Sequence, residues 1–122
     1  MKLRIRGNSI RLRLRRGEVE RLATEGVVEE RTDFGGGRTL TYALVAEDVP
    51  AVSAELDGAR IVVRVPRAAA ARWAATEDVG IECFQPAADG PLKIRVEKDF
   101  ACTDAAADEP QDDAFPNPNH CP

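Results

Sequence analysis

Aromatic side chains, cysteine and long apolar runs are all scarce in this sequence. Phenylalanine, tyrosine and tryptophan make up only 5% of the 122 residues, so platforms for stacking single-stranded nucleic acid are not expected. Three cysteines are too few and too scattered for a disulfide framework, and their odd number fits a reducing compartment. No apolar run approaches the ~20 residues that a membrane span needs, and no secretory signal is evident. We therefore expect a cytoplasmic domain without a membrane segment.

Sequence motifs that carry known chemistry are also missing. Gly35-Gly36-Gly37 lacks the Lys-Ser/Thr of a phosphate loop and lies between two predicted strands, so it indicates a hairpin loop. The single histidine, His120, is too near the end of the sequence to be well placed for a catalytic triad. Cys102, His120 and Cys121 are weak candidates for a metal site, because adjacent His and Cys cannot present two ligands to one zinc ion from one turn. No cofactor and no catalytic residue is predicted.

Charge is unevenly distributed along a chain of ordinary hydrophobic content. The hydrophobic fraction of 43% is typical of a folded domain. Residues 1–16 carry seven basic side chains and no acidic one, whereas residues 101–122 carry five acidic side chains and no basic one. The net charge of −4 thus hides a basic head and an acidic tail. Such an asymmetry bears on association and solubility rather than on the fold.

An internal repeat organises the first hundred residues. Shifting the sequence by 51 positions aligns its first thirty residues with a second copy, and a one-residue gap extends the match. The aligned pairs include Gly7 with Gly58, Ile10 with Ile61, Arg13 with Arg64, Leu22 with Trp73, Val28 with Val79 and, after the gap, Leu40 with Leu92, Tyr42 with Ile94 and Leu44 with Val96. Turn glycines, strand parity and helix stripes agree between the copies, which favours a true duplication.

The repeat predicts an α+β fold. We expect one domain over residues 1–100, built from two pseudo-symmetric ββαββ units at residues 1–48 and 52–99. The strands are expected to form a largely antiparallel sheet or half-barrel with two short helices. Residues 101–122, rich in Asp, Ala, Pro and Asn, are predicted to be a mostly irregular acidic tail.

The first hairpin of each unit is predicted from a two-residue turn that contains glycine. Asp57-Gly58 is typical of a type I′ turn and would place Glu55 opposite Arg60 across the strands. The matching turn in the first unit is Arg6-Gly7. The predicted core faces are Leu3, Ile5, Ile10, Leu12 and Leu14 in the first hairpin, and Val52, Ala54, Leu56, Ala59, Ile61, Val63 and Val65 in the second.

A helix of about three turns and a second hairpin follow in each unit. The apolar stripes are Val19, Leu22 and Ala23, ending at Gly26, and Ala69, Ala70, Trp73 and Ala74, with Pro66 at the first helical position. The remaining strands are predicted at residues 27–34, 39–45, 79–84 and 92–96. We expect Leu22 and Trp73 to occupy equivalent core positions, one under each helix.

Two stretches of sequence resemble a family of small uncharacterised bacterial proteins. The first is Lys-Leu-Arg-Ile-Arg-Gly-Asn-Ser-Ile-Arg-Leu-Arg-Leu at residues 2–14, followed by Glu18-Val19-Glu20. The second is Val-Glu-Lys-Asp-Phe-Ala-Cys at residues 96–102, followed by Asp-Ala-Phe-Pro-Asn-Pro at residues 113–118. Arg15-Arg16-Gly17 departs from the Thr-x-Ser-like helix cap of that family. The resemblance implies a bacterial cytoplasmic setting and a domain of unknown function, and it transfers no catalytic residue.

The first hairpin carries a cluster of basic side chains that alternate with its apolar ones: Lys2, Arg4, Arg6, Arg11, Arg13 and Arg15. Like charges that face one another across strands are destabilising, so something should neutralise them. One hypothesis is a site for an anionic ligand or a protein partner. The other is neutralisation within the protein, by the acidic residues of positions 18–30 or by the acidic tail. The acidic net charge and the lack of interleaved aromatics disfavour nucleic acid as the partner.

The tail contains Phe115-Pro116-Asn117-Pro118, an aromatic followed by two prolines in a polar context. Phe115, Pro116 and Pro118 are candidates for an anchor that docks on a protein surface, and a plain disordered end is the alternative.

Taken together, the sequence favours a small non-enzymatic binding or adaptor protein. The alternative is an enzyme acting on a phosphorylated small molecule, with arginines lining a barrel. A binding face should be open, whereas an enzyme needs a concave pocket with converging acids and bases.

Overall fold

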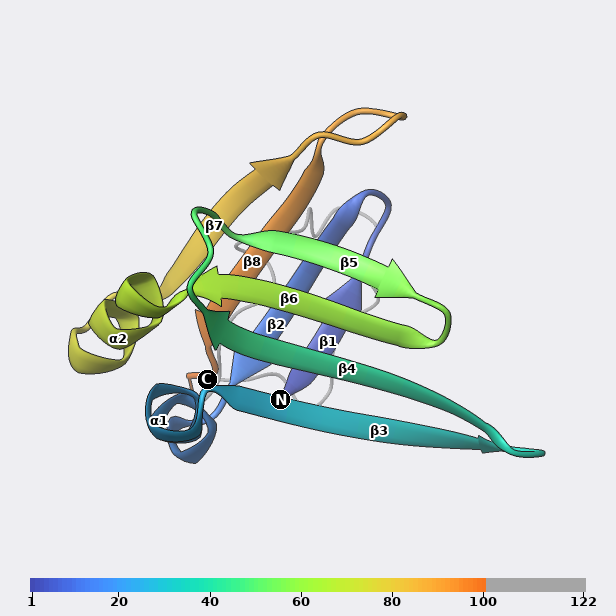
Figure 1. The fold of residues 1–122 in the computed structure, drawn as a ribbon, viewed down its shortest axis with the longest axis horizontal. Coiled ribbons are helices and arrows are strands. Elements are labelled where there is room, and N and C mark those ends of the chain that lie inside the picture. Colours follow the sequence, from blue (N-terminus) through green and yellow to red (C-terminus); the bar gives the residue numbers. More distant parts are fainter. Residues whose placement is uncertain (101–122) are drawn as a thin grey trace, which may run out of the picture.

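Two four-stranded sheets and two helices make up the computed structural model, which describes residues 1–100 (Figure 1). The first repeat unit contains β1 (Lys2–Ile5), β2 (Ser9–Leu14), α1 (Arg16–Glu25), β3 (Val27–Gly35) and β4 (Arg38–Glu47). The second contains β5 (Ser53–Asp57), β6 (Arg60–Pro66), α2 (Arg67–Ala75), β7 (Gly80–Gln85) and β8 (Leu92–Lys98). The predicted α+β class with two ββαββ units is therefore confirmed.

Each unit gives one hairpin to each sheet. Sheet A has the strand order β1-β2-β8-β7, and sheet B has the order β3-β4-β6-β5. The two strands of each hairpin pair in antiparallel fashion. The two hairpins of a sheet then meet at its centre through a parallel pair, β2 with β8 in sheet A and β4 with β6 in sheet B. The strands are thus divided between two mixed sheets instead of forming one continuous sheet.

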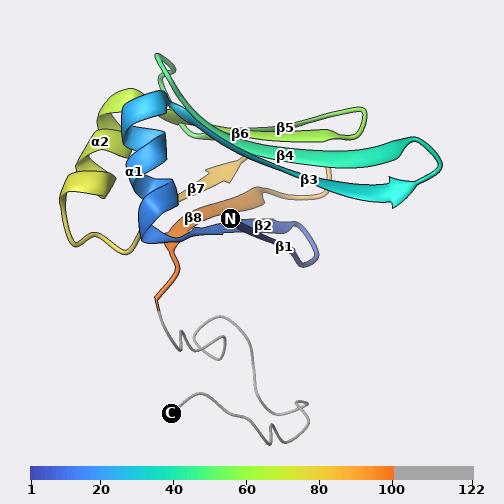
Figure 2. The ribbon, with the colours of Figure 1, turned by 90° about the horizontal axis from the view of Figure 1, so that it is seen from below.

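The helices explain this division. Figure 2 shows α1 and α2 side by side at one end of the molecule, where α1 leads from sheet A to sheet B. A ten-residue helix is ~15 Å long, which is enough to cross between two sheets packed ~10 Å apart. The second hairpin of each unit therefore joins the opposite sheet from the first.

The repeat is structural as well as sequential. Replacing each strand of sheet A by its counterpart in the other repeat unit gives the order β5-β6-β4-β3. This is the strand order of sheet B, listed from the opposite edge. The register agrees, because Ile10 pairs with Ile94 in sheet A while its repeat partner Ile61 pairs with Tyr42 in sheet B. The sequence alignment fails only at β7. Val28 is buried but Val79 is exposed, because residues 76–79 form a longer link after α2 than Gly26 does after α1.

The predicted turns of the first hairpins are each misplaced by one residue. Asp57 pairs with Arg60, so the second turn is Gly58-Ala59, and the first turn is Gly7-Asn8. A glycine with φ of 53° or 57° occupies the first position of each turn, a conformation that other residues rarely adopt. Glu55 consequently lies opposite Val62 rather than Arg60. The inward faces are unchanged, because moving a turn by one residue moves each cross-strand partner by two.

One apolar core lies between the sheets and under the helices. Leu22 and Trp73 are both 1% exposed, which confirms that they occupy equivalent core positions. The indole Nε1 of Trp73 also donates a hydrogen bond to the Val79 carbonyl at 3.1 Å. Two predicted core residues, Ile5 and Leu56, are instead 59% and 72% exposed, because they lie at the strand ends farthest from the helices. Ala23 and Ala59 are exposed as well.

The start of α1 is held by a carboxylate. Glu18 accepts a hydrogen bond from the Arg15 backbone N–H at 2.8 Å, and it also binds the Met1 amine. The same amine contacts Glu30. Burial alone would raise the pKa of Glu18, but the hydrogen bonds from the Met1 amine and from Arg15 outweigh it and lower that pKa.

The Trp73→Ala substitution should lower the free energy of unfolding by about 3–5 kcal/mol, because it leaves a large cavity in the shared core. Urea denaturation followed by circular dichroism measures this loss. Phe84→Ala is the matched control, since Phe84 is exposed and its removal should cost less than about 1 kcal/mol. Equal losses in the two variants would show that Trp73 does not hold the core together.

Glu18→Gln should reduce stability at neutral pH and make it less sensitive to acid. A carboxyl whose folded-state pKa is lowered stabilises the protein above its unfolded-state pKa, and this contribution is lost as the pH falls through the folded-state value. Glutamine keeps the hydrogen bond to Arg15 but removes the charge. Thermal unfolding between pH 7 and pH 3 tests this, with the exposed Glu20→Gln as control. Parallel pH profiles for wild type and Glu18→Gln would contradict the assignment.

Candidate functional site

The outer face of sheet A carries most of the basic side chains of the first hairpin. Strand alternation places Leu12 and Val96 in the core, so Arg11 and Arg95 beside them point outward. The same alternation applies along β1, β2 and β8. We define the basic face by the side chains on this surface: Lys2, Arg4, Arg6, Arg11, Arg13, Lys93 and Arg95.

The register lines these side chains up in rows across the sheet. Arg4 on β1 lies opposite Arg11 on β2, which lies opposite Arg95 on β8. Three arginines therefore occupy adjacent strands, which are separated by ~4.8 Å. In the next row, Lys2 lies opposite Arg13, and Arg13 lies opposite Glu97. This arrangement concentrates positive charge on three neighbouring strands.

Glu97 is the centre of an ion-pair network on this face. Its carboxylate lies 2.7 Å from Arg95, 3.6 Å from Arg13 and 3.7 Å from Arg11. Gly80 on β7 lies opposite Glu97 on β8 and leaves space for the Glu97 side chain. A Cβ at Gly80 would lie 2.5 Å from the Val96 carbonyl oxygen and 3.0 Å from Glu97 Cγ. One carboxylate thus serves three guanidinium groups.

Two further carboxylates border the basic face. Glu82 on β7 lies 3.2 Å from Arg95 and 3.9 Å from Lys93, and Asp99 lies 3.0 Å from Lys2. Within residues 1–100, seven basic side chains of this surface therefore meet three carboxylates. Among the described residues, basic side chains therefore outnumber acidic ones on the basic face.

Arg11 lies at the centre of the basic face, between Arg4 and Arg95. Only 6% of Arg11 is exposed. Burial lowers the pKa of its guanidinium, and the charges of Arg13, Arg4 and Arg95 lower that pKa further, against the opposing effect of Glu97. An arginine remains cationic under these conditions, so a nearby anion stabilises it. The buried Nε of Arg13 also lacks a hydrogen-bond acceptor within the part of the chain that the structure describes.

The outer face of sheet B provides an internal comparison. The repeat places Ser53, Glu55, Asp57 and Val62 where sheet A has Lys2, Arg4, Arg6 and Arg11. Arg60 and Arg64 of sheet B pair with acids, since Arg60 lies 2.8 Å from Glu29 and Arg64 lies 3.4 Å from Glu55. The same scaffold therefore folds without a row of basic side chains on this face, so the basic row of sheet A is not a requirement of the fold.

The acids expected to neutralise the basic hairpin from positions 18–30 lie elsewhere. Glu18 and Glu30 bind the Met1 amine, while Glu25 pairs with Arg21 and Glu29 with Arg60. Among residues 1–100, the acids that pair with the face are Glu82, Glu97 and Asp99, all from the second repeat unit. The sequence does not show that these acids, together with Lys93 and Arg95, lie beside the first hairpin, because the parallel pairing of β2 with β8 joins residues 84 positions apart. The alternation of Lys93, Arg95 and Glu97 along the sequence was the available signal.

The remaining sequence candidates are placed as follows. Arg15 follows β2 and is the residue just before α1, so it lies outside the rows of the sheet. The metal candidates Cys102, His120 and Cys121 and the anchor candidates Phe115, Pro116 and Pro118 lie outside the described residues. Among residues 1–100, no group of three or more His, Cys, Asp or Glu side chains could hold a metal ion.

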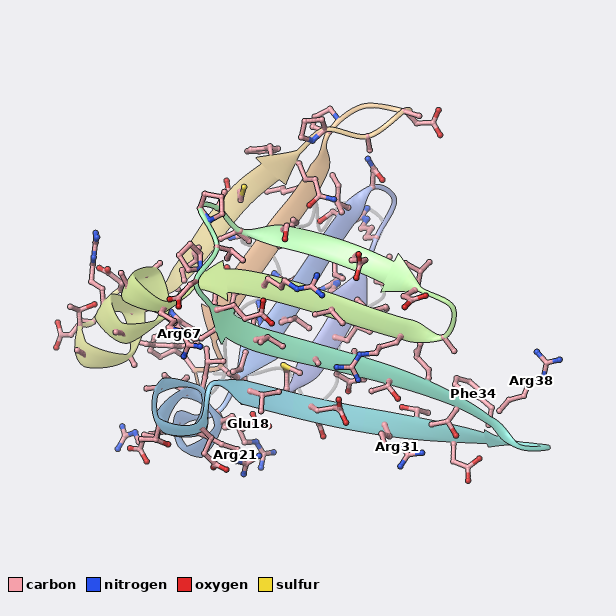
Figure 3. All side chains as sticks on the ribbon, viewed as in Figure 1. Glu18, Arg21, Arg31, Phe34, Arg38 and Arg67 are labelled. Carbon is pink, nitrogen blue, oxygen red and sulfur yellow. The ribbon has the colours of Figure 1, made fainter. Side chains whose placement is uncertain are left out.

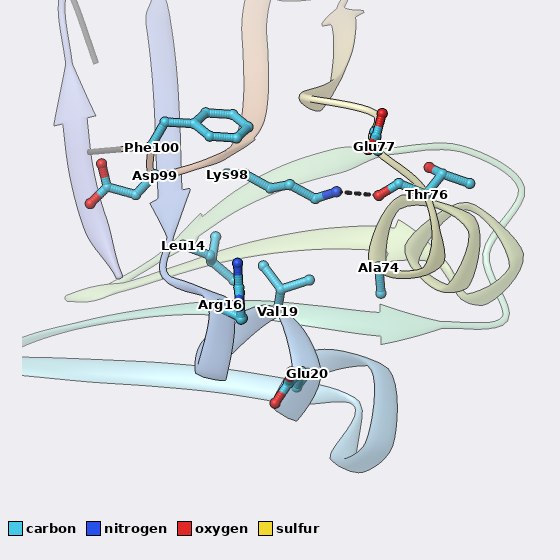
Figure 4. A pocket seen from close by; sticks show the side chains of 10 residues that line it. All are labelled: Leu14, Arg16, Val19, Glu20, Ala74, Thr76, Glu77, Lys98, Asp99 and Phe100. Atoms are coloured by element: carbon cyan, nitrogen blue, oxygen red, sulfur yellow. Dashed lines mark hydrogen bonds between the residues drawn. The ribbon is translucent and has the colours of Figure 1, made fainter. Parts of the chain in front are cut away.

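A pocket of about 660 Å³ lies between the helices and the end of β8 (Figure 4). Lys98 on its wall donates a hydrogen bond to the Thr76 carbonyl at 2.6 Å and lies 6.0 Å from the centre of the Trp73 ring. Thr76 is the C-terminal cap of α2, where a positive charge is favourable. Lys98 thus binds the end of α2. Arg16, Glu20, Glu77 and Asp99 also line the pocket, and Asp99 pairs with Lys2 on β1.

Two apolar features complete the surface. A shallow hollow at the end of the sandwich farthest from the helices is lined by Ile5, Ile10, Leu56 and Leu92. The β3–β4 hairpin extends beyond the other strands of sheet B and carries Phe34, 69% exposed, near its tip (Figure 3). Neither feature brings together groups that titrate or bind an anion.

Glu97→Gln should destabilise the protein by about 1–3 kcal/mol, because it removes the carboxylate shared by three guanidinium groups. Glu82→Gln is the matched control on the same face, since Glu82 is 46% exposed against 12% for Glu97 and exposed pairs contribute little. Urea denaturation of both variants gives the comparison. A loss for Glu97→Gln no larger than for Glu82→Gln would contradict the central role of Glu97.

Comparisons with known proteins show the family to which the chain belongs. No helix among residues 1–100 is long and apolar enough to cross a membrane. No curated protein and no solved structure matches the chain significantly. Residues 1–119 match the model of a family described only as being of unknown function, which confirms the resemblance found in the sequence. The chain is a member of this family of unknown function, DUF7009.

Proposed function

We propose that the chain is a non-enzymatic binding protein that recognises an acidic segment of a partner protein through its basic face. The observation that carries this proposal is the excess of basic side chains on three adjacent strands of sheet A. The comparison with sheet B supports it, because the same scaffold there carries Arg60 and Arg64 paired with acids and no row of basic side chains. Positive charges that the fold does not require, and that repel one another, are favourable when an anionic partner covers them.

The shape of the surface favours binding over catalysis. The basic side chains point away from the sandwich, whose interior is lined by apolar residues such as Leu12, Val63 and Val96. An enzyme for a phosphorylated small molecule would need arginines inside a barrel, but the two sheets do not close into one and no basic side chain belongs to the core described for residues 1–100. An open sheet face suits an extended partner better than a small substrate.

The chemistry of the face favours carboxylates over nucleic acid. Guanidinium groups bind carboxylates in bidentate geometry, and Glu97 already shows that this surface accommodates one among Arg11, Arg13 and Arg95. In an extended peptide, alternate acidic side chains are ~6.6 Å apart, which is within reach of arginines on strands ~4.8 Å apart. Bases would find few stacking partners here, because Phe84 is the one aromatic on the outer face of sheet A within residues 1–100.

We also propose a cytoplasmic location. The low cysteine content and the free thiol of Cys83 support a reducing compartment. The binding reaction itself needs no cofactor or metal.

Neutralising three basic side chains of the face should weaken binding to an acidic peptide about tenfold or more. The variant is Lys2→Gln, Arg6→Gln and Lys93→Gln, and the probe is a fluorescent oligoglutamate titrated at low salt and followed by anisotropy. The matched control is Arg31→Gln, Arg38→Gln and Arg67→Gln, which changes the net charge equally on β3, β4 and α2 (Figure 3). Only the first variant should lose affinity, because local charge rather than net charge carries the interaction.

A salt series and a DNA probe complete this experiment. Binding to oligoglutamate should weaken steeply between 0.05 and 0.5 M NaCl, because exposed charges are screened over less than ~10 Å above 0.1 M. Equal affinity in both triple variants would refute the proposed face. Tighter binding of a DNA oligonucleotide than of oligoglutamate, lost in the first variant only, would show that the face recognises nucleic acid instead.

A further inference from the structure

The described chain ends at one corner of the basic face. The Asp99 backbone N–H donates a hydrogen bond to the Leu14 carbonyl at 2.8 Å, where β2 ends. Its carboxylate lies 3.0 Å from Lys2 on β1. The end of β8 is thus fixed beside the strands that carry most of the basic side chains. Whatever follows Phe100 in the sequence starts next to this surface.

The sequence that follows is acidic, with its acidic residues between positions 104 and 113. Residues 101–122 contain Asp104, Asp108, Glu109, Asp112 and Asp113 and no lysine or arginine. The acidic tail and the basic face therefore have opposite charge. Among residues 1–100, the face carries seven basic groups and three carboxylates, so its charge is complementary to that of the tail.

The length of the tail is sufficient for it to cover the face. An extended chain spans up to ~3.5 Å per residue, so Asp104 can lie up to ~17 Å from Asp99 and Asp113 up to ~49 Å. The basic face measures ~17 Å along β2 and ~10 Å from β1 to β8, at ~3.3 Å per residue and ~4.8 Å per strand. Every acidic residue of the tail can therefore reach the arginine rows without strain in the chain.

Tethering makes such a contact effective even if each pair is weak. Single exposed ion pairs contribute little to stability. A segment attached at the edge of its own binding surface, however, has an effective concentration in the millimolar range for short flexible linkers. A free acidic partner at micromolar concentration would have to displace it.

We propose that residues 101–122 occupy the basic face of the same molecule and compete there with the acidic partner. The tail then regulates the face, because a partner binds only when it displaces the tail. This proposal rests on the proposed function for the identity of the competitor, but the contact between tail and face does not depend on it. The surface of the face, its charge and the place where the tail begins carry the inference.

The test neutralises the tail without shortening the chain. The variant is Asp104→Asn, Asp108→Asn, Glu109→Gln, Asp112→Asn and Asp113→Asn, and the probe is the same oligoglutamate at 0.05 M NaCl. We expect the tail variant to bind at least tenfold more tightly than wild type. The difference should disappear at 0.5 M NaCl, where both proteins bind weakly.

The control variant removes five acids from other exposed positions: Glu20→Gln, Glu25→Gln, Glu77→Gln, Asp78→Asn and Asp89→Asn. It changes the net charge equally, so a gain of affinity equal to that of the tail variant would overturn the proposal. Equal affinity of wild type and tail variant would overturn it too, while leaving the proposed function standing. A synthetic peptide of residues 101–115 should likewise bind the tail variant at least tenfold more tightly than wild type. If this peptide binds and oligoglutamate does not, the tail contact is correct and the proposed function is wrong.

Sedimentation velocity distinguishes a contact within one molecule from a contact between two. Wild type and tail variant should sediment alike, as one species, over a hundredfold range of concentration. A larger species in wild type that dissociates in the tail variant would show that the tail binds the face of a second copy, and would overturn the proposal as stated.

Discussion

The parallel pairing of β2 with β8, and of β4 with β6, is the contact on which the rest of the structure depends. An isolated two-stranded hairpin is marginally stable in water, so each hairpin needs a neighbour. Because α1 and α2 carry the second hairpin of each unit to the opposite sheet, that neighbour always comes from the other unit. The two units therefore share one core, with Leu22 and Trp73 at equivalent places in it. We expect neither unit to fold without the other.

The same pairing creates the basic face. Arg11 and Arg95 belong to different units and become neighbours only because β2 and β8 lie in parallel register. Glu97 arrives on the same strand and offsets part of the repulsion. On sheet B the equivalent surface has Val62 in place of Arg11 and matched ion pairs around it. Two faces of one scaffold thus differ in charge, and the proposed binding function rests on that difference.

The sequence predicted the features that depend on neighbouring residues, namely the inward faces of the strands and the buried stripes of the helices. The hydrophobic alternation fixed the inward faces of the strands, and the helical stripe placed Leu22 and Trp73 correctly. Each turn was misplaced by one residue because its glycine suits either turn position. The division of the strands between two sheets could not be predicted, since strand periodicity says which side faces inward but not which distant strand lies beside it. The contribution of Arg95 and Glu97 to the site was hidden for the same reason.

The binding of anions to the outer face of sheet A can be tested directly by a single measurement. Amide chemical shifts in nuclear magnetic resonance spectra of the tail-neutralised protein, recorded while oligoglutamate is added, locate the binding surface residue by residue. The account predicts that the perturbed amides lie on β1, β2 and β8, and that β3 to β6 are unaffected. Perturbations centred on sheet B, or on the pocket between the helices and the end of β8, would contradict it.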